Sequence, residues 1–170
     1  MSIKIKIIFL LVSLFLLQAC SNGFHLHKKV TLADKYKSVT VQGLERDSQQ
    51  FKALKLALQE AGVFVVQYPD KALTKSTIKI QNLREGKRVV AYTSKRKVRE
   101  YLLFLKFDYS LVDNSINKNR PVKITRINLD RAFLYDVNFV LGKTEEERQI
   151  RNTMYAEAAR LILLKMQYAR

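Results

Sequence analysis

The sequence predicts an α+β two-layer sandwich, in which a four-stranded sheet carries two helices packed on one face. Four stretches alternate between apolar and polar residues, and two others place apolar residues at helical spacing. The chain has 170 residues, of which 48% are hydrophobic, and this suffices for one domain with a buried core. The predicted order is β-α-β-β-β-α, and helices on one face leave the opposite face of the sheet partly open to a partner.

The first strand and the first helix are short. A strand is predicted over residues 36–42, where valines alternate with hydroxyl side chains. A helix follows over residues 49–61, where four apolar side chains recur at helical spacing. Asp47 or Ser48 is expected to cap its first turn, and Gly62 is expected to end it.

Three longer strands are predicted over residues 77–93, 98–112 and 121–135. The second of them has the clearest alternation in the chain, with six apolar residues on one face. A brief apolar run at residues 63–67 is not counted as a strand. The predicted sheet therefore has four strands.

Two irregularities are expected in these strands. Residues 85–86 are predicted to form a bulge or tight turn, with Val90 and Tyr92 pointing inward after it. In the last strand the apolar phase shifts between Ile124 and Ile127, which suggests a second bulge.

The last helix is predicted from residue 144 to about residue 167, after a loop at residues 136–143. Thr144 is expected to be its N-cap, and Glu147 is expected to reach back and complete a capping box. One stripe of this helix is apolar: Ile150, Met154, Ala158 and Leu161.

The N-terminus has the anatomy of a signal peptide. Two lysines precede an apolar run at residues 7–17, whose helical length of about 16 Å is too short for a hydrocarbon core of about 30 Å. The run ends in Leu17-Gln18-Ala19-Cys20, which resembles the bacterial lipobox, and Cys20 is the only cysteine. We expect a signal peptide at residues 1–19 and acylation of Cys20 on its thiol and its new amino group. The alternative is an ordinary secretory signal that happens to end near a cysteine.

The expected domain organisation is a lipidated tether at residues 20–35 and a single domain at residues 36–170. Ser21 stands where aspartate would retain a lipoprotein in the inner membrane of enteric-type bacteria, so we expect anchoring to the periplasmic side of the outer membrane. The formal net charge is +16. Basic proteins often bind nucleic acid, but export removes that partner, and lipopolysaccharide (LPS) is the polyanion at the outer membrane.

The chain shows no catalytic or metal-binding motif. His25 and His27 have no convincing further ligands nearby. Three aspartates have no histidine or nucleophile motif beside them: Asp108, Asp130 and Asp136. Three aromatic residues are expected in the sheet core rather than on a sugar-stacking platform: Tyr101, Phe107 and Tyr109. We therefore expect neither an enzyme nor a cofactor, apart from the acyl groups on Cys20.

Several short motifs resemble, in their order, those of the LptE family of LPS-assembly lipoproteins. Gly23-Phe24-His25-Leu26-His27 matches a Gly-aromatic-x-Leu-Arg motif, with His27 where arginine is usual. Glu100-Tyr101 follows a basic turn, and Arg131-Ala132-Phe133-Leu134-Tyr135-Asp136 precedes Leu141-Gly142-Lys143 and an acidic helix start. Met154-Tyr155-Ala156-Glu157-Ala158-Ala159 resembles the family's Met-Tyr-x-x-Ala-Ala helix. The resemblance covers nearly the whole mature chain.

The resemblance implies a binding and assembly function without catalysis. Family members sit inside the outer-membrane β-barrel LptD, plug it, help it fold, and bind LPS on its way to the cell surface. The implied partners are LptD and LPS, with a lipid anchor and no nucleic acid. Large barrels can enclose a plugged lumen, so a domain of this size is suitable as the plug of such a barrel.

Basic residues are the candidate LPS contacts. Lys95, Arg96 and Lys97 are predicted at a hairpin tip, flanked by Arg88 and Arg99, where they can grip lipid A phosphates. Lys143 occupies the family's loop position before the last helix, where the resemblance implies a basic residue linked to LPS binding. The simpler alternative for these residues is a solvated surface. The sequence does not decide whether both groups lie at the same end of the sheet.

Two other functions stay open. A pilot-type lipoprotein that escorts another outer-membrane complex, such as a secretin, would share the lipobox. A lipid-anchored periplasmic hydrolase would need a catalytic constellation, and the chain shows none.

Overall fold

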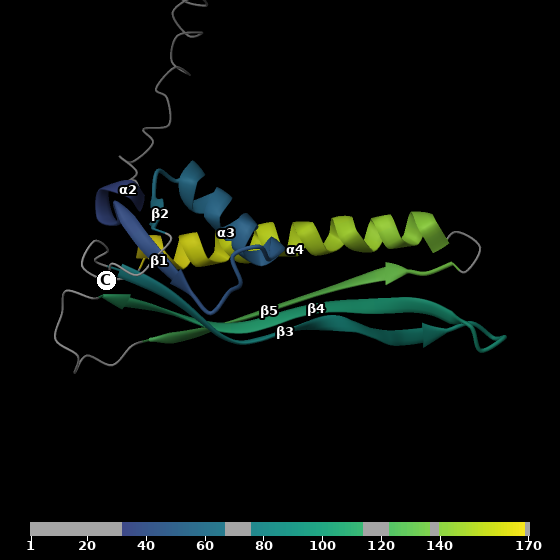
Figure 1. Ribbon diagram of the computed structural model, residues 1–170. Helices are drawn as coiled ribbons and strands as arrows, with labels where there is room; N and C mark the ends of the chain where they lie inside the picture. Colours follow the sequence, from purple (N-terminus) through teal and green to yellow (C-terminus); the bar gives the residue numbers. More distant parts are fainter. Residues whose placement is uncertain (1–31, 67–75, 114–122, 137–139, 169–170) are drawn as a thin grey trace, which may run out of the picture.

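A computed structural model describes residues 32–66, 76–113, 123–136 and 140–168. Its elements are α2 (Leu32–Lys35), β1 (Ser38–Gln42), α3 (Gln49–Glu60), β2 (Phe64–Val66), β3 (Ser76–Tyr92), β4 (Val98–Asp113), β5 (Ile124–Leu134) and α4 (Val140–Tyr168). Figure 1 shows a two-layer α+β body, with α3 and α4 on one face of the sheet. We call the opposite face of the sheet the outer face.

The sheet has five strands in the order β2-β1-β3-β4-β5. β1 runs parallel to both β2 and β3, whereas β3, β4 and β5 are antiparallel neighbours. The prediction of four strands is wrong because Phe64–Val66 pairs with β1 at the sheet edge. Three residues are too few to show an alternating pattern in the sequence.

The ends of α3 were predicted well. Ser48 is its N-cap, and its Oγ accepts a hydrogen bond of 3.2 Å from the Phe51 amide. Gly62 has a φ of 76°, and the Val63 amide donates to the Leu58 carbonyl at 2.9 Å, which closes the C-terminal turn. The last four residues of the predicted tether form α2, whose Leu32 packs into the core.

A bulge lies in β3, but not at the predicted position. The register shifts between Gln81 and Arg84, and Asn82 has a φ of 54°. Residues 85–86 instead pair regularly with β4. The left-handed region is open to asparagine as well as to glycine, whereas Gly86 makes room for the ring of Phe104, which a Cβ atom would meet at 2.8 Å.

The bulge decides which side chains of β3 face the helices. Ile78 and Ile80 are buried before it. After it the alternation is reversed, so Val90 and Tyr92 are 46% and 63% exposed rather than inward. The prediction for these two side chains is therefore wrong.

β4 and β5 complete the core face. Four apolar side chains of β4 are buried as predicted: Leu103, Leu105, Phe107 and Tyr109. β5 pairs with β4 in continuous register, so the bulge predicted between Ile124 and Ile127 is absent from this pair. Ile124 simply lies on the outer face, where it is 63% exposed.

α4 begins at Val140, before the predicted loop has ended. Thr144 lies inside the helix and is not its N-cap, so the predicted capping box is wrong. Glu147 instead accepts hydrogen bonds from Lys87 and Arg151. The apolar stripe was predicted correctly, since Met154 and Ala158 are buried between α4 and the sheet, and Ile150 and Leu161 pack at the margin of that core. None of the helices in the described ranges is long and apolar enough to cross a membrane.

Candidate functional site

The basic residues singled out in the sequence gather at one end of the sheet. β3 and β5 both run antiparallel to β4, so the turn after β3 and the segment after β5 leave from the same end. The Tyr135 amide donates to the Arg99 carbonyl at 2.8 Å and joins the segment after β5 to the start of β4. Figure 1 shows the β3–β4 hairpin tip and the start of α4 at this end. We call the group the basic end: Arg88, Lys95, Arg96, Lys97, Arg99 and Lys143.

Hydrogen bonds fix the turn that presents three of these cations. The Thr93 amide donates to the Lys97 carbonyl at 2.7 Å, and the Arg96 amide donates to the Thr93 carbonyl at 2.9 Å. The Lys97 amide also donates to the Thr93 hydroxyl at 3.1 Å. Arg96 has a φ of 57°, a left-handed conformation that non-glycine residues adopt at a cost. The turn is thus defined although Lys95, Arg96 and Lys97 are exposed.

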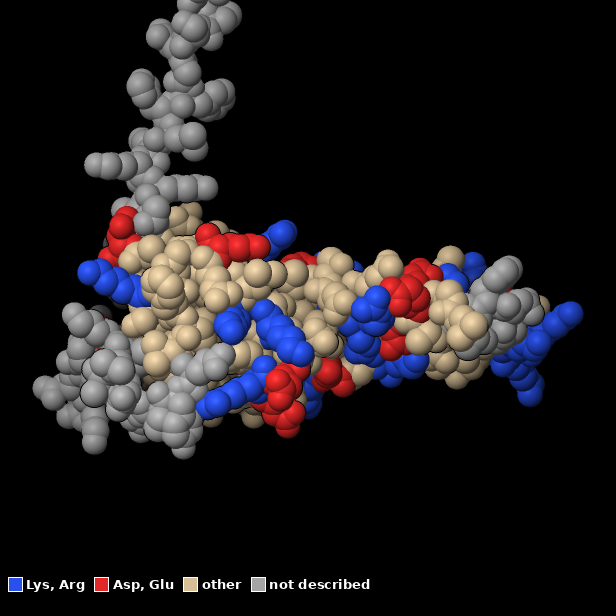
Figure 2. All heavy atoms as spheres, turned by 45° about the horizontal axis from the view of Figure 1, so that its top comes forward, with Lys and Arg blue, Asp and Glu red and all other residues tan. Residues whose placement is uncertain are grey.

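The hairpin cations carry uncompensated charge. Within the described ranges, no ion pair joins Lys95, Arg96 or Lys97 to a carboxylate. Figure 2 shows blue side chains projecting from the corresponding tip of the molecule. A cluster of like charges produces a positive potential that attracts anions, and arginine can bind a phosphate through two parallel hydrogen bonds.

Lys143 differs from the hairpin cations. It lies in the first turns of α4, not in the predicted loop, and its side chain is only 22% exposed. Its Nζ lies 2.6 Å from Oε2 of Glu146. An anion at Lys143 would therefore compete with an existing ion pair. Arg88 is exposed on β3 and pairs in register with Leu102.

The other predicted N-terminal features lie outside the described residues. They include Cys20, His25 and His27. Of the predicted core aromatics, Phe107 and Tyr109 are buried, and Tyr101 is half-buried. The Tyr101 ring stacks on Phe133 at a centroid distance of 5.7 Å.

Two of the three aspartates considered for catalysis lie in ion pairs. Asp108 pairs with Arg126 at 2.8 Å, and Asp130 lies 4.0 Å from Lys106. Asp136 also has an interaction partner. In the part of the chain that the structure describes, no group of three or more His, Cys, Asp or Glu side chains is arranged to hold a metal ion.

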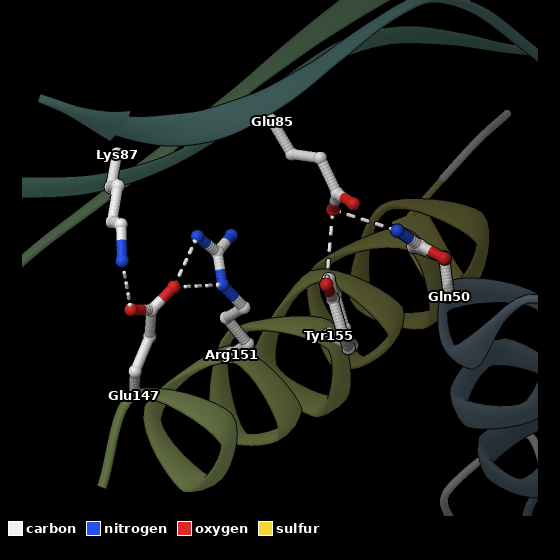
Figure 3. A network of polar contacts seen from close by, with 6 residues as sticks. All are labelled: Gln50, Glu85, Lys87, Glu147, Arg151 and Tyr155. Atoms are coloured by element: carbon white, nitrogen blue, oxygen red, sulfur yellow. Dashed lines mark hydrogen bonds and ion pairs between the residues drawn. The ribbon is translucent and has the colours of Figure 1, made fainter. Parts of the chain in front are cut away.

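A polar network connects α4 to β3 behind the basic end (Figure 3). Oε2 of Glu147 accepts a hydrogen bond of 2.7 Å from Lys87, and its Oε1 accepts two, of 3.0 and 2.8 Å, from Arg151. Burial alone would raise the pKa of Glu147, but the hydrogen bonds from Lys87 and Arg151 outweigh it and lower the pKa. The network therefore keeps Glu147 ionised and holds the first half of α4 over the sheet.

A second carboxylate extends this network toward α3. Oε2 of Glu85 accepts from the Tyr155 hydroxyl at 3.0 Å and from Gln50 at 2.7 Å. Burial and the nearby Glu85 charge raise the pKa of Tyr155 to about 12. Glu85 and Lys87 were not predicted to have this role, because they face α4 only after the bulge at Asn82 reverses the alternation of β3.

Comparisons with known proteins agree with this fold. The chain matches the family model "LptE: Lipopolysaccharide-assembly" over residues 36–166. No curated protein sequence matches it. The solved structure of uncharacterized lipoprotein B from Nitrosomonas europaea has 23% identity and a TM-score of 0.64, covering 83% of this chain and 88% of that one.

Two further solved structures are similar in fold. Rare lipoprotein B from Shewanella oneidensis has 16% identity and a TM-score of 0.62, covering 76% of this chain and 92% of that one. A minor lipoprotein from Acinetobacter baumannii has 16% identity and a TM-score of 0.59, covering 78% and 91%. The family match extends from the first strand almost to the end of α4, and the chain therefore belongs to the LptE family of lipopolysaccharide-assembly proteins.

Proposed function

We propose that this chain is an outer-membrane lipoprotein that binds LPS and assembles with the β-barrel LptD to deliver LPS to the cell surface. The match to the LPS-assembly family over residues 36–166 is the observation that carries the proposal. Acyl groups on Cys20 anchor the chain to the periplasmic side of the membrane, and its role in assembly involves no catalysis. Several acyl chains on one residue suffice for stable anchoring.

The basic end supplies the LPS contacts. Lys95, Arg96 and Lys97 are exposed and have no ion pair within the described ranges, so a phosphate does not have to displace a carboxylate from them. Charge-assisted hydrogen bonds from these side chains to lipid A phosphates are stronger than neutral ones. Lys143 contributes less, because LPS must compete with Glu146 for its ammonium group.

The shape of the body suits a plug. α4 has 29 residues and is about 43 Å long, and α3 and α4 pack along the sheet rather than projecting from it (Figure 1). A two-layer body with one continuous core can fill a wide barrel lumen without unfolding.

LPS binding is tested with charge reversal at the hairpin. The tip variant, Lys95→Glu with Arg96→Glu and Lys97→Glu, is expected to bind a fluorescent LPS probe at least about tenfold more weakly, since each cation makes a charge-assisted contact. The matched control reverses three exposed cations elsewhere: Lys37, Lys52 and Arg160. Equal affinity of the tip variant and the wild-type chain would remove the basic end as the LPS site.

The barrel partnership needs a separate experiment. The native lipoprotein, purified from detergent-solubilised outer membranes, is expected to carry LptD in a near one-to-one complex. The tip variant is expected to retain this complex. Recovery of a secretin in place of LptD would favour the pilot-type alternative.

A further inference from the structure

A hollow on the outer face lies beside the β3 bulge, away from the basic end. Its volume is about 300 Å³, and it opens to solvent. Its polar lining comes from three adjacent strands: Asn82, Arg84, Lys106, Asp108, Arg126 and Asn128. Three of these side chains are cations and only one is an anion. Arg84 lies eight residues before the end of β3, about 26 Å along the strand from the hairpin turn, and four residues, or about 13 Å, from Arg88, the member of the basic end on the same strand.

Asp108 organises this hollow. It is 8% exposed, and both of its carboxylate oxygens are occupied. Oδ1 accepts from Nε of Arg126 at 2.8 Å, and Oδ2 accepts from Nδ2 of Asn82 at 2.9 Å. The hydrogen bonds from Arg126 and Asn82 lower the pKa of Asp108. Asp108 thus stays ionised and connects the bulge to β5.

This arrangement leaves donors available to a ligand. The contact with Asp108 uses Nε of Arg126, and within the described residues no hydrogen bond occupies its terminal Nη1 and Nη2. The Arg126 side chain is 72% exposed. Arg84 is exposed and has no ion pair within the described ranges, and Nζ of Lys106 lies 4.0 Å from the nearest oxygen of Asp130, at the limit of an ion pair.

Neutralisation of Asp108 does not explain three cations. Arg126 pairs with Asp108, and Lys106 lies at the ion-pair limit from Asp130, which leaves Arg84 as a cation in the same hollow with no ion pair in the described ranges. Like charges held this close repel one another. Such a surplus favours binding of an anion. The donors come from three strands and surround the hollow, which suits a tetrahedral oxyanion better than a planar carboxylate.

We propose that this hollow is an oxyanion site that binds a phosphate-ester group, separate from the basic end. The terminal nitrogens of Arg126 bind two phosphate oxygens, and Arg84 and Lys106 contact the others. The phosphate belongs either to a soluble sugar phosphate or to a lipid headgroup, and the hollow recognises the chemistry that both share. The inference stands on this geometry alone and does not rest on LPS binding.

The test is an NMR titration of the full-length chain in neutral detergent. The probes are inorganic phosphate, glucosamine 1-phosphate, and phosphatidylglycerol added as mixed micelles with the same detergent. The signals are the Arg126 Nε–H and the side-chain amides of Asn82 and Asn128. Saturable shifts with a soluble probe indicate a soluble phosphate ligand, and shifts with the phosphatidylglycerol micelles alone indicate a lipid headgroup.

Substitutions test whether a probe binds in the hollow itself. Arg84→Gln is expected to raise the dissociation constant of the effective probe at least about tenfold, because one charge-assisted contact is lost. Arg84 makes no hydrogen bond to Asp108, so this variant keeps the hydrogen bonds that Asp108 accepts from Arg126 and Asn82. Lys106→Gln provides a second variant of the same kind. Lys52→Gln, on α3, is the matched control. No saturable shift with any probe, or equal affinity in the variants and the control, would overturn the proposal.

The experiment also separates this site from LPS binding. The tip variant is expected to keep the phosphate titration of the hollow unchanged. If its titration disappears together with LPS binding, the hollow is not an independent site and the proposal fails. If the hollow titrates normally in a chain that does not bind LPS, the oxyanion site stands and only the proposed function fails.

Discussion

At the residue scale, Gly43 is the position that tolerates a side chain least. Its φ is 89°, and a Cβ atom would lie 1.9 Å from the carbonyl oxygen of Ile80. The neighbour is backbone in the central strand, so it cannot rotate away. Gly43 therefore allows β1 to turn toward α3 while lying against β3.

Gly43→Ala is expected to lower the free energy of unfolding by about 3 kcal/mol or more, because it combines backbone strain with a steric clash. Gly142→Ala is the control, since a Cβ at Gly142 meets nothing within 4 Å and the residue lies inside α4. The control is expected to be neutral or to stabilise by up to about 1 kcal/mol. Urea denaturation measures both, and equal midpoints would contradict the packing at Gly43.

The raised pKa of Tyr155 predicts how the stability of the fold changes at high pH. Its pKa is raised to about 12, so the folded chain holds the phenolic proton that the unfolded chain releases near pH 10. Stability from this group is therefore complete below pH ~10 and is lost as the pH rises toward 12. Tyr155→Phe is expected to reduce that loss by on the order of 2 kcal/mol. Denaturation midpoints of both chains, measured from pH 9 to 11.5, test this, and parallel pH profiles would count against it.

At the scale of elements, the two halves of α4 are attached to the sheet by different kinds of contact. Its second half buries Met154, Ala158 and Ile162 in the core, whereas Leu141 near its start is 89% exposed. The first half is held to the sheet by Glu147, which binds Lys87 of β3. Apolar burial thus fixes one half, and a polar contact positions the other next to the basic end.

Glu147→Gln is expected to increase hydrogen exchange at the amides of residues 144–150, while the amides of residues 158–166 stay protected. The expected loss of local stability is about 1 kcal/mol, because the neutral glutamine no longer forms the ion pairs that Glu147 makes with Lys87 and Arg151. Because the folded pKa of Glu147 is lowered, the same increase in exchange is expected in the wild-type chain as the pH falls below ~4.

Glu145→Gln, which removes a more exposed pair with Arg148, is the control and is expected to cost at most ~0.5 kcal/mol. Equal exchange in the two variants would contradict the assigned role of Glu147.

The sequence predicted elements where a local pattern determines them. The alternation of β4 and the cap at Ser48 depend only on neighbouring residues, and both are correct. The bulge was misplaced because Asn82 adopts the left-handed conformation that was expected of Gly86, four positions later. The start of α4 was misplaced because Thr144-Glu145-Glu146-Glu147 has the composition of a capping box, but Glu147 has a stronger partner on β3. That partner is 60 residues away and has no local signal.

At the scale of the whole molecule, the sheet topology joins what the sequence keeps apart. Lys95 and Lys143 lie at the same end of the sheet only because β3 and β5 run in the same direction beside β4. No local pattern encodes strand direction, so the sequence identified the cations of the basic end but not that they share one end of the sheet. The hollow on the outer face was missed for the same reason, since Arg84, Lys106 and Arg126 come from three different strands.

Anchoring and folding are expected to be independent properties of this chain. The described core extends from Leu32 to Met166 and is built around a continuous sheet, so nothing in it requires the Cys20 thiol. Cys20→Ala is therefore expected to release the protein from the membrane fraction while its thermal midpoint in detergent changes by less than about 2 °C, as for a substitution away from the core. Ser21→Ala is the matched control and is expected to stay membrane-bound. Membrane fractionation and mass spectrometry of the N-terminal peptide test this directly, because the acyl groups are added to that peptide. An unmodified Cys20 in a membrane-bound wild-type chain would contradict anchoring by lipid on this residue.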